Sequence, residues 1–173
     1  MATNRAAETE PAPRMNKRAL LDEILRHLNA EVEMMTQAAL ATHAEATDDE
    51  NKAEDKYDTR GLEASYLAHG QSRAAEEAAQ AVAQFRALPA RDFADGDPVS
   101  LGALVCVETK GRSAWYFVGP RAGGTEIEWD GRAVMVVTPQ SPLGRQLVGK
   151  SAGSVLQLDV GGRNSEARIA RVV

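Results

Sequence analysis

The chain is poor in cysteine and in aromatic residues. Its single cysteine, Cys106, excludes an internal disulfide framework and fits a reducing compartment. It stands in the apolar stretch LVCVET, where a small buried side chain is the expected role. Aromatic residues make up 5% of the 173 positions while hydrophobic residues make up 43%, and many of the latter are alanines in the first half. This composition favours closely packed helices there.

Long hydrophobic runs are also missing. No apolar stretch approaches the roughly 20 residues of a membrane span, so no membrane partner is expected. Residues 1–14, MATNRAAETEPAPR, lack the apolar centre of a signal peptide and predict a flexible tail. A cytoplasmic protein is expected. The net charge of −5 is concentrated in residues 1–92, which carry 11 basic and 17 acidic groups, so independent DNA binding is not expected.

The sequence offers little material for a catalytic centre of its own. Its three histidines, His27, His43 and His69, lie in the helical half without a cysteine pair or a tight spacing to carboxylates. Positions on the surface or flanking the helix seam are expected for them, and neither a zinc site nor a nucleophilic triad can be assembled. The chain is therefore not expected to be an enzyme.

One phosphate-loop pattern needs separate treatment. GRQLVGKS, residues 144–151, matches G-x-x-x-x-G-K-[ST]. That motif requires a strand before the loop and a helix beginning at the Lys-Ser pair. Here the local pattern predicts a helix before Lys150 and a strand after it. We therefore reject nucleotide binding.

Two segments show heptad periodicity, with apolar or small residues at alternating steps of four and three. Neither segment has a proline between its limits, and their equal lengths predict an antiparallel coiled-coil hairpin over residues 15–92. In this arrangement the residue numbers of two facing positions add up to about 106. This pairs Leu28 with Ala78 and places the turn near Ala53, between Thr47 and Asp58. The seam residues are Leu21, Leu25, Leu28, Val32, Met35, Ala39 and Thr42 in the first segment, and Ala64, Ala68, Gln71, Ala75, Ala78, Val82 and Phe85 in the second.

The expected hairpin tip is strongly acidic. Residues 44–60 hold seven carboxylates and three basic groups. A solvated loop is the simplest interpretation of such a charge run. Seven carboxylates repel one another, however, and this density is best tolerated where a cation or a basic cavity offsets it.

After a hinge rich in proline, glycine and aspartate, residues 93–173 predict a small antiparallel β domain with one short helix, so the fold class is α+β. Ser141 is the expected N-cap of that helix, Pro142 its first residue and Gly149 its stop. Aromatic residues at 115–117 and 129 are expected in the core, with a ligand pocket as the alternative. The expected strands are 103–109, 114–120, 124–130, 133–139, 154–160 and 166–173.

The order of hairpin, acidic tip, hinge and strand-rich domain resembles the bacterial Gre transcript-cleavage factors. The segment VVTPQSPLGRQLVGKSAGSVLQLDV looks like the Gre C-terminal signature, and the organisation covers residues from about 15 to 173. The resemblance implies an FKBP-like C-terminal domain. It also implies a partner, RNA polymerase, whose secondary channel admits the hairpin, with contact to the nascent RNA 3′ end in the complex.

In the family the tip helps to hold Mg²⁺ at the polymerase active site, so the resemblance implies a shared metal site and no metal bound stably by this chain alone. Gre tips carry an Asp and, three residues later, a Glu followed by Asn; here Glu50-Asn51 matches, but Thr47 stands at the earlier position. The resemblance places Ser141, Pro142 and Leu143 at the channel rim. The metal candidates are Asp48, Asp49 and Glu50, followed by Glu54 and Asp55.

Three alternatives stay open at the level of sequence. A Gre-like protein with an altered tip would inhibit or retune polymerase without stimulating cleavage. An FKBP-like prolyl isomerase or chaperone would use residues 96–173 directly. A helical adaptor would use the hairpin surface to tether partners, with the acids only keeping the tip soluble.

Overall fold

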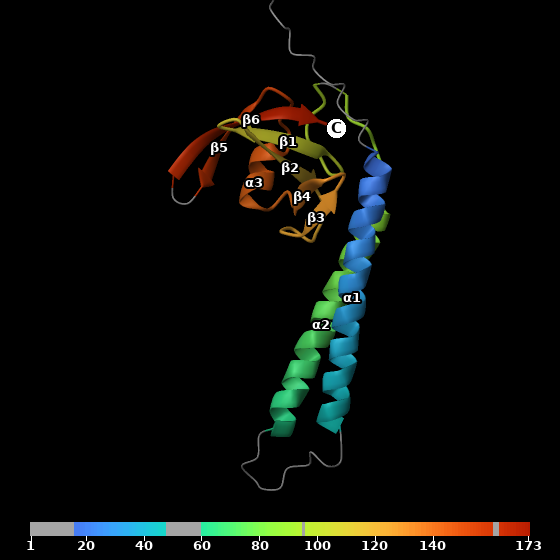
Figure 1. The fold of residues 1–173 in the computed structure, drawn as a ribbon. Helices are drawn as coiled ribbons and strands as arrows, with labels where there is room; N and C mark the ends of the chain where they lie inside the picture. Colours follow the sequence, from blue (N-terminus) through green and yellow to red (C-terminus); the bar gives the residue numbers. More distant parts are fainter. Residues whose placement is uncertain (1–15, 48–59, 95, 161–162) are drawn as a thin grey trace, which may run out of the picture.

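The computed structural model describes residues 16–47, 60–94, 96–160 and 163–173. The described chain is α+β, with two long helices followed by a sheet and one short helix (Figure 1). The helices are α1 (Lys17–Thr47), α2 (Arg60–Arg86) and α3 (Pro142–Leu147). The strands are β1 (Leu104–Thr109), β2 (Arg112–Val118), β3 (Glu126–Trp129), β4 (Arg132–Val137), β5 (Val155–Val160) and β6 (Arg163–Val172).

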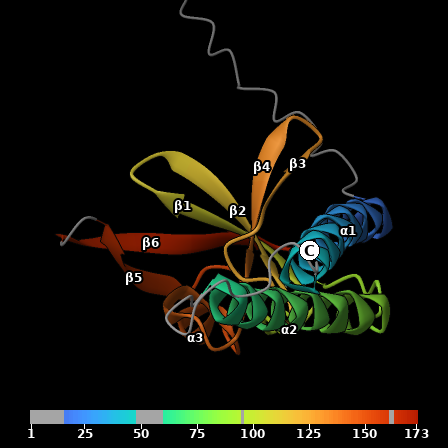
Figure 2. The same cartoon turned by 90° about the horizontal axis from the view of Figure 1, so that it is seen from below.

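Helices α1 and α2 lie side by side and run in opposite directions (Figures 1 and 2). Every predicted seam residue of α1, and all those of α2 except the undescribed Ala64 side chain, are buried or half-buried. The predicted partners Leu28 and Ala78 line one groove, which the two helices form together with the loop before β3. Helical periodicity therefore predicted the contact faces correctly. The supercoil of a coiled coil stays a prediction, and the turn expected between Thr47 and Asp58 lies outside the described residues.

The sheet is mixed, so the prediction of an antiparallel domain is wrong at one pairing. Within the described residues the strand order is β3-β4-β2-β1-β6-β5. Strands β2 and β4 pair in parallel, whereas the other four neighbouring pairs are antiparallel. Strand β4 buries Val134, Val136 and Val137, whereas β3 alternates exposed glutamates with Ile127 and Trp129. The more apolar β4 therefore takes the interior place and leaves β3 at the edge.

One face of the sheet shares a hydrophobic core with the base of the hairpin. Leu20, Ile24 and Phe85 pack in one cluster with the sheet residues Leu104 and Phe117, all at most 1% exposed. The rings of Phe85 and Phe117 stack with centroids 6.2 Å apart. A methyl group at Gly119 would lie 2.6 Å from the Phe85 ring, so the glycine permits this close approach. The hairpin base is thus fixed on the sheet.

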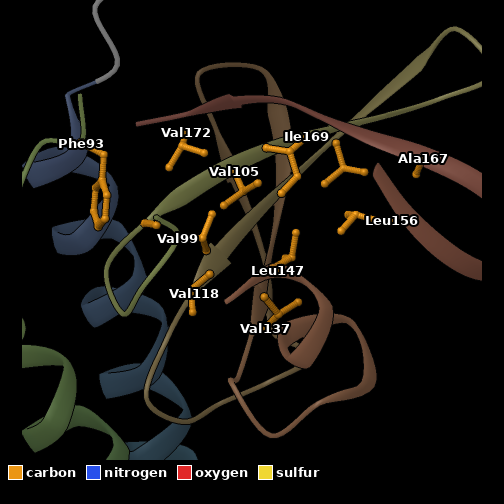
Figure 3. Close-up of a cluster of buried hydrophobic side chains, with 12 residues drawn as sticks. Phe93, Val99, Val105, Val118, Val137, Leu147, Leu156, Ala167, Ile169 and Val172 are labelled. Carbon is orange, nitrogen blue, oxygen red and sulfur yellow. The ribbon is translucent and has the colours of Figure 1, made fainter. Parts of the chain in front are cut away.

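The opposite face of the sheet forms a second core, which α3 covers (Figure 3). Leu147 of α3 is fully buried there against residues that include Val105, Leu156 and Ile169. The neighbouring Gln146 side chain links α3 to β5. Its amide donates to the Gln157 carbonyl at 2.7 Å and accepts from the Gln157 backbone N–H at 3.0 Å. These two bonds occupy part of the open edge of β5, where an unpaired strand would otherwise invite association.

The start of α1 is tied to the hinge through a buried lysine. Lys17 is 2% exposed, and its ammonium donates to the Arg91 carbonyl at 2.5 Å. The same ammonium lies 4.3 Å from the centre of the Phe93 ring. Burial lowers the pKa of Lys17 to about 8, although Asp92 nearby acts in the opposite direction.

We expect this lysine to make stability increase with pH. Between about pH 8 and the ordinary value of 10.5, the unfolded chain keeps the Lys17 proton that the folded chain has lost. The folded state is therefore favoured increasingly as pH rises through that window. In the Lys17→Met variant this increase should be absent. Urea midpoints measured from pH 7.5 to 10 for both proteins test the expectation, and parallel curves would contradict it.

Candidate functional site

The predicted docking residues Ser141, Pro142 and Leu143 form the start of α3. The Ser141 backbone is extended, and its hydroxyl oxygen accepts from the Gly144 backbone N–H at 3.0 Å while the hydroxyl donates to the Thr138 carbonyl at 2.8 Å. Pro142 occupies the first turn, where its missing N–H costs no hydrogen bond. The sequence prediction of this helix, including its N-cap, is confirmed.

A groove of about 470 Å³ opens beside these three residues. Its walls come from β4 and from the loop before β3, so residues distant in sequence complete it. Pro142 is exposed and Met135 is 37% exposed, and both present apolar surface to solvent. The lining residues are Gly123, Gly124, Met135, Val136, Val137, Thr138, Ser141, Pro142 and Leu143.

Gly144 holds the groove in shape by a close backbone contact. A methyl group on Gly144 would lie 1.8 Å from the Thr138 carbonyl oxygen, a distance that no side chain can occupy. The helix can therefore approach the end of β4 only with glycine at this position. Sequence reasoning did not single out Gly144 for this role, and it missed Met135. Met135 interrupts the run of valines in β4, but only the strand order brings it beside Leu143.

The five metal candidates Asp48, Asp49, Glu50, Glu54 and Asp55 lie outside the described residues. The helix ends that flank them, Thr47 and Arg60, lie at the end of the hairpin remote from the sheet (Figure 1). Elsewhere, no group of three or more histidine, cysteine, aspartate or glutamate side chains is arranged to hold a metal among the described residues. In the described ranges, no helix has the length and apolarity to cross a membrane.

The histidines, the cysteine and the aromatic residues considered from sequence have structural roles or lie on the surface. His27, His43 and His69 are exposed, as expected. Cys106 is 6% exposed, and burial raises the pKa of its thiol, which disfavours the reactive thiolate. Phe117 is fully buried, while Trp115 and Trp129 pack at the margin of the core shared with the hairpin.

The phosphate-loop pattern does not form a phosphate loop. Its residues begin inside α3, which ends at Leu147, and β5 begins only at Val155. The Gly149 N–H donates to the Val99 carbonyl at 2.8 Å, and the Lys150 carbonyl accepts from the Val99 N–H at 2.7 Å. The glycine-lysine segment is thus engaged in a backbone bridge, with no helix N-terminus to receive a phosphate.

Among known proteins, similarity to this chain is found in solved structures. No family model matches the chain, and no curated protein does. The chain is similar to the GreA factor homolog 1 (Gfh1) protein of Thermus thermophilus, with 20% identity, coverage of 86% of this chain and 94% of that one, and a TM-score of 0.37. It is similar to Thermus aquaticus Gfh1, with 19% identity, coverage of 90% and 93%, and a TM-score of 0.38. A structure described as the transcription factor Gfh1 has 20% identity, coverage of 86% and 92%, and a TM-score of 0.38.

Proposed function

We propose that this protein is a Gre-like transcription factor that binds RNA polymerase and inserts its helical hairpin into the secondary channel of the enzyme. In this proposal the protein does no chemistry alone. Its acidic tip acts on the active-site Mg²⁺ of polymerase, next to the nascent RNA 3′ end, and either stimulates transcript cleavage or changes catalysis in another way.

The observation that carries the proposal is the shape of the hairpin. Its base is anchored in a core shared with the sheet, where Leu28 is the last fully packed residue of α1. Val32 packs against this core and Met35 lies beside the loop before β3; from Met35 to Thr47 the helix continues for about 18 Å at 1.5 Å per residue, away from the sheet (Figure 1). An anchored rod of this kind suits insertion into a narrow channel, with the body left outside.

The sequence between the far helix ends provides the chemistry for the tip. Carboxylate oxygens are the ligands that Mg²⁺ prefers, and this ion commonly keeps part of its coordination for waters, phosphates or a partner. Asp48, Asp49 and Glu50 are the proposed contacts, with Glu54 and Asp55 next along the chain. The groove at Ser141, Pro142 and Leu143 is the proposed contact with the rim of the channel.

The first experiment adds the purified protein to backtracked elongation complexes and follows transcript length. Shortened transcripts would show stimulated cleavage, and a changed elongation rate without shortening would show an inhibitor or modulator. If the protein does not bind polymerase and leaves the length and rate of transcript synthesis unchanged, the proposed function is wrong. A prolyl isomerase assay on the same preparation then tests the FKBP-like alternative.

We expect the triple substitution Asp48→Asn, Asp49→Asn and Glu50→Gln to remove the effect on transcription while polymerase binding survives. The amides keep the size and polarity of the side chains but lose the charge on which metal contact depends. The measurement compares binding and transcript output side by side.

A matched control removes the same charge from the hairpin shaft, through Asp22→Asn, Glu33→Gln and Glu76→Gln, all at exposed positions. This control should behave like the unmodified protein. If the tip variant binds normally and still acts on transcription, the metal contact is wrong. If it no longer binds, the tip is a docking element held by basic groups of the channel.

A further inference from the structure

A second cleft, of about 480 Å³, lies at the end of the sheet away from the hairpin. It is bounded by the turn between β1 and β2 and by the facing parts of β5 and β6. It shares no lining residue with the groove at Ser141, and the proposed function does not use it. Its lining residues are Val107, Thr109, Lys110, Arg112, Ser113, Ala114, Tyr116, Leu158 and Ser165.

The cleft exists because α3 is shorter than the sheet face it covers. This helix has only six residues, and its buried Leu147 packs near Val105, Leu156 and Ile169 (Figure 3). Strands β1 and β2 continue past this cluster to Thr109 and Arg112. Val107 is buried at the inner end of this stretch, but Ala114 is exposed and Leu158 is half-buried, so part of the apolar face stays uncovered, and Ala114 is too small to fill the space.

The charge of the cleft has one sign. Lys110 and Arg112 are exposed at its mouth, and no carboxylate is among the lining residues. Neither cation forms an ion pair with any described residue. The Lys110 position is fixed, because Lys110 and Gly111 have φ angles of 49° and 76° and form the tight turn of the β1–β2 hairpin.

Two hydroxyl groups add neutral donors. Ser165 is 8% exposed and Tyr116 is half-buried, and in the described part of the chain neither hydroxyl has a hydrogen-bond partner. Burial raises the pKa of Tyr116, so its hydroxyl keeps its proton at neutral pH. Both oxygens still reach solvent, since neither is among the buried polar atoms without a partner in the described chain, and each is open to a ligand oxygen.

We propose that this cleft binds a small amphipathic carboxylate, a medium-chain fatty acid in its simplest form. The carboxylate would lie between Lys110 and Arg112, within reach of the hydroxyls, and the apolar chain would cover Ala114, Tyr116 and Leu158. The apolar floor excludes a free phosphate or a sugar, which would lose water without gaining hydrogen bonds. The volume lies within the range of about 300–1,000 Å³ that is typical of small-molecule sites.

The test titrates the full-length protein with decanoate, with decanol and with inorganic phosphate, by calorimetry and by amide chemical shifts. We expect saturable one-to-one binding of decanoate, with shifts confined to the ends of β1, β2 and β5. Decanol should bind about tenfold more weakly or worse, because it lacks the charge-assisted contacts, and phosphate should not bind.

The variants separate charge from shape. Lys110→Asn with Arg112→Gln should weaken decanoate binding about tenfold or more, and asparagine still tolerates the left-handed turn. Ala114→Phe should abolish binding by filling the cleft, at an exposed position where the core is not disturbed. Lys150→Gln removes a cation elsewhere on the surface and should change nothing.

Several results would overturn the proposal. These are equal affinity for decanol and decanoate, unchanged binding by the Lys110/Arg112 double variant, shifts scattered over the hairpin, and no saturable binding of decanoate. Failure here leaves polymerase binding untouched, since the two sites share no residue.

Discussion

Replacing Leu28 with aspartate is expected to lower the free energy of unfolding by about 4 kcal/mol or more. Removal of a buried leucine alone costs about 2–5 kcal/mol, and an unpaired buried carboxylate adds to that cost. Leu28 is 3% exposed, and its groove contains two carboxylates, Glu31 and Glu77, against the single cation Arg121, so a third carboxylate would gain no net attraction. Because Leu28 belongs to the core shared with the sheet, the loss should affect the whole cooperative transition.

The matched control is Leu40→Asp on the same helix. Leu40 is 58% exposed, so the substitution should change the free energy of unfolding by less than about 1 kcal/mol. Urea unfolding followed by circular dichroism, with tryptophan fluorescence as a second probe, measures both variants. Equal effects at the two positions would contradict the assigned helix face. Loss of helical signal without change in fluorescence would contradict the shared core.

The second large effect is expected at Gly144. A Gly144→Ala substitution would force a methyl group into the Thr138 carbonyl, so α3 must move away from β4. We expect a stability loss of about 3 kcal/mol, as for other overpacked sites, and a Tm lower by about 6–12 °C. Displacement of the helix would also open the groove at Ser141 and Leu143, so the proposed binding to polymerase should weaken at temperatures where the protein is still folded.

Gly70→Ala provides the opposite control. No atom lies within 4 Å of a methyl group at Gly70, and the residue is exposed inside α2. Alanine there should stabilise the protein by about 0.5–1 kcal/mol, since glycine has the greater conformational freedom to lose in a helix. Calorimetric unfolding of both variants is the measurement. A Gly144→Ala protein as stable as the original would show that α3 is not held against Thr138.

The proposed rim contact was predictable where the chemistry is local. Ser141 as N-cap and Pro142 in the first turn follow from residues adjacent in sequence, because a cap depends on only three or four positions. Met135 and Gly124, which complete the groove, were missed, because their place beside Leu143 depends on strand order. The acidic tip was predicted from its charge and from the helical periodicity on either side, and its residues lie outside the described structure.

The sequence by itself determined the elements of this protein. Heptad spacing marked both helices and the faces they bury, and the expected strands lie within three residues of the observed ones, with Lys110-Gly111 and Asp130-Gly131 in two of the turns. These signals are local, because periodicity and positive φ angles are properties of short segments.

Only the tertiary structure decided which of those elements take the buried positions. Strand β4 took the place beside β2 in parallel, because it offers more apolar side chains than β3 to the two cores. The base of the hairpin became one wall of the sheet core, through Phe85 and Phe117, and Gly119 made that contact possible. The cleft at Tyr116 remained open, because six residues of α3 cannot cover a face of that length. Burial is shared among distant segments, so its outcome depends on all of them together and on no single stretch of sequence.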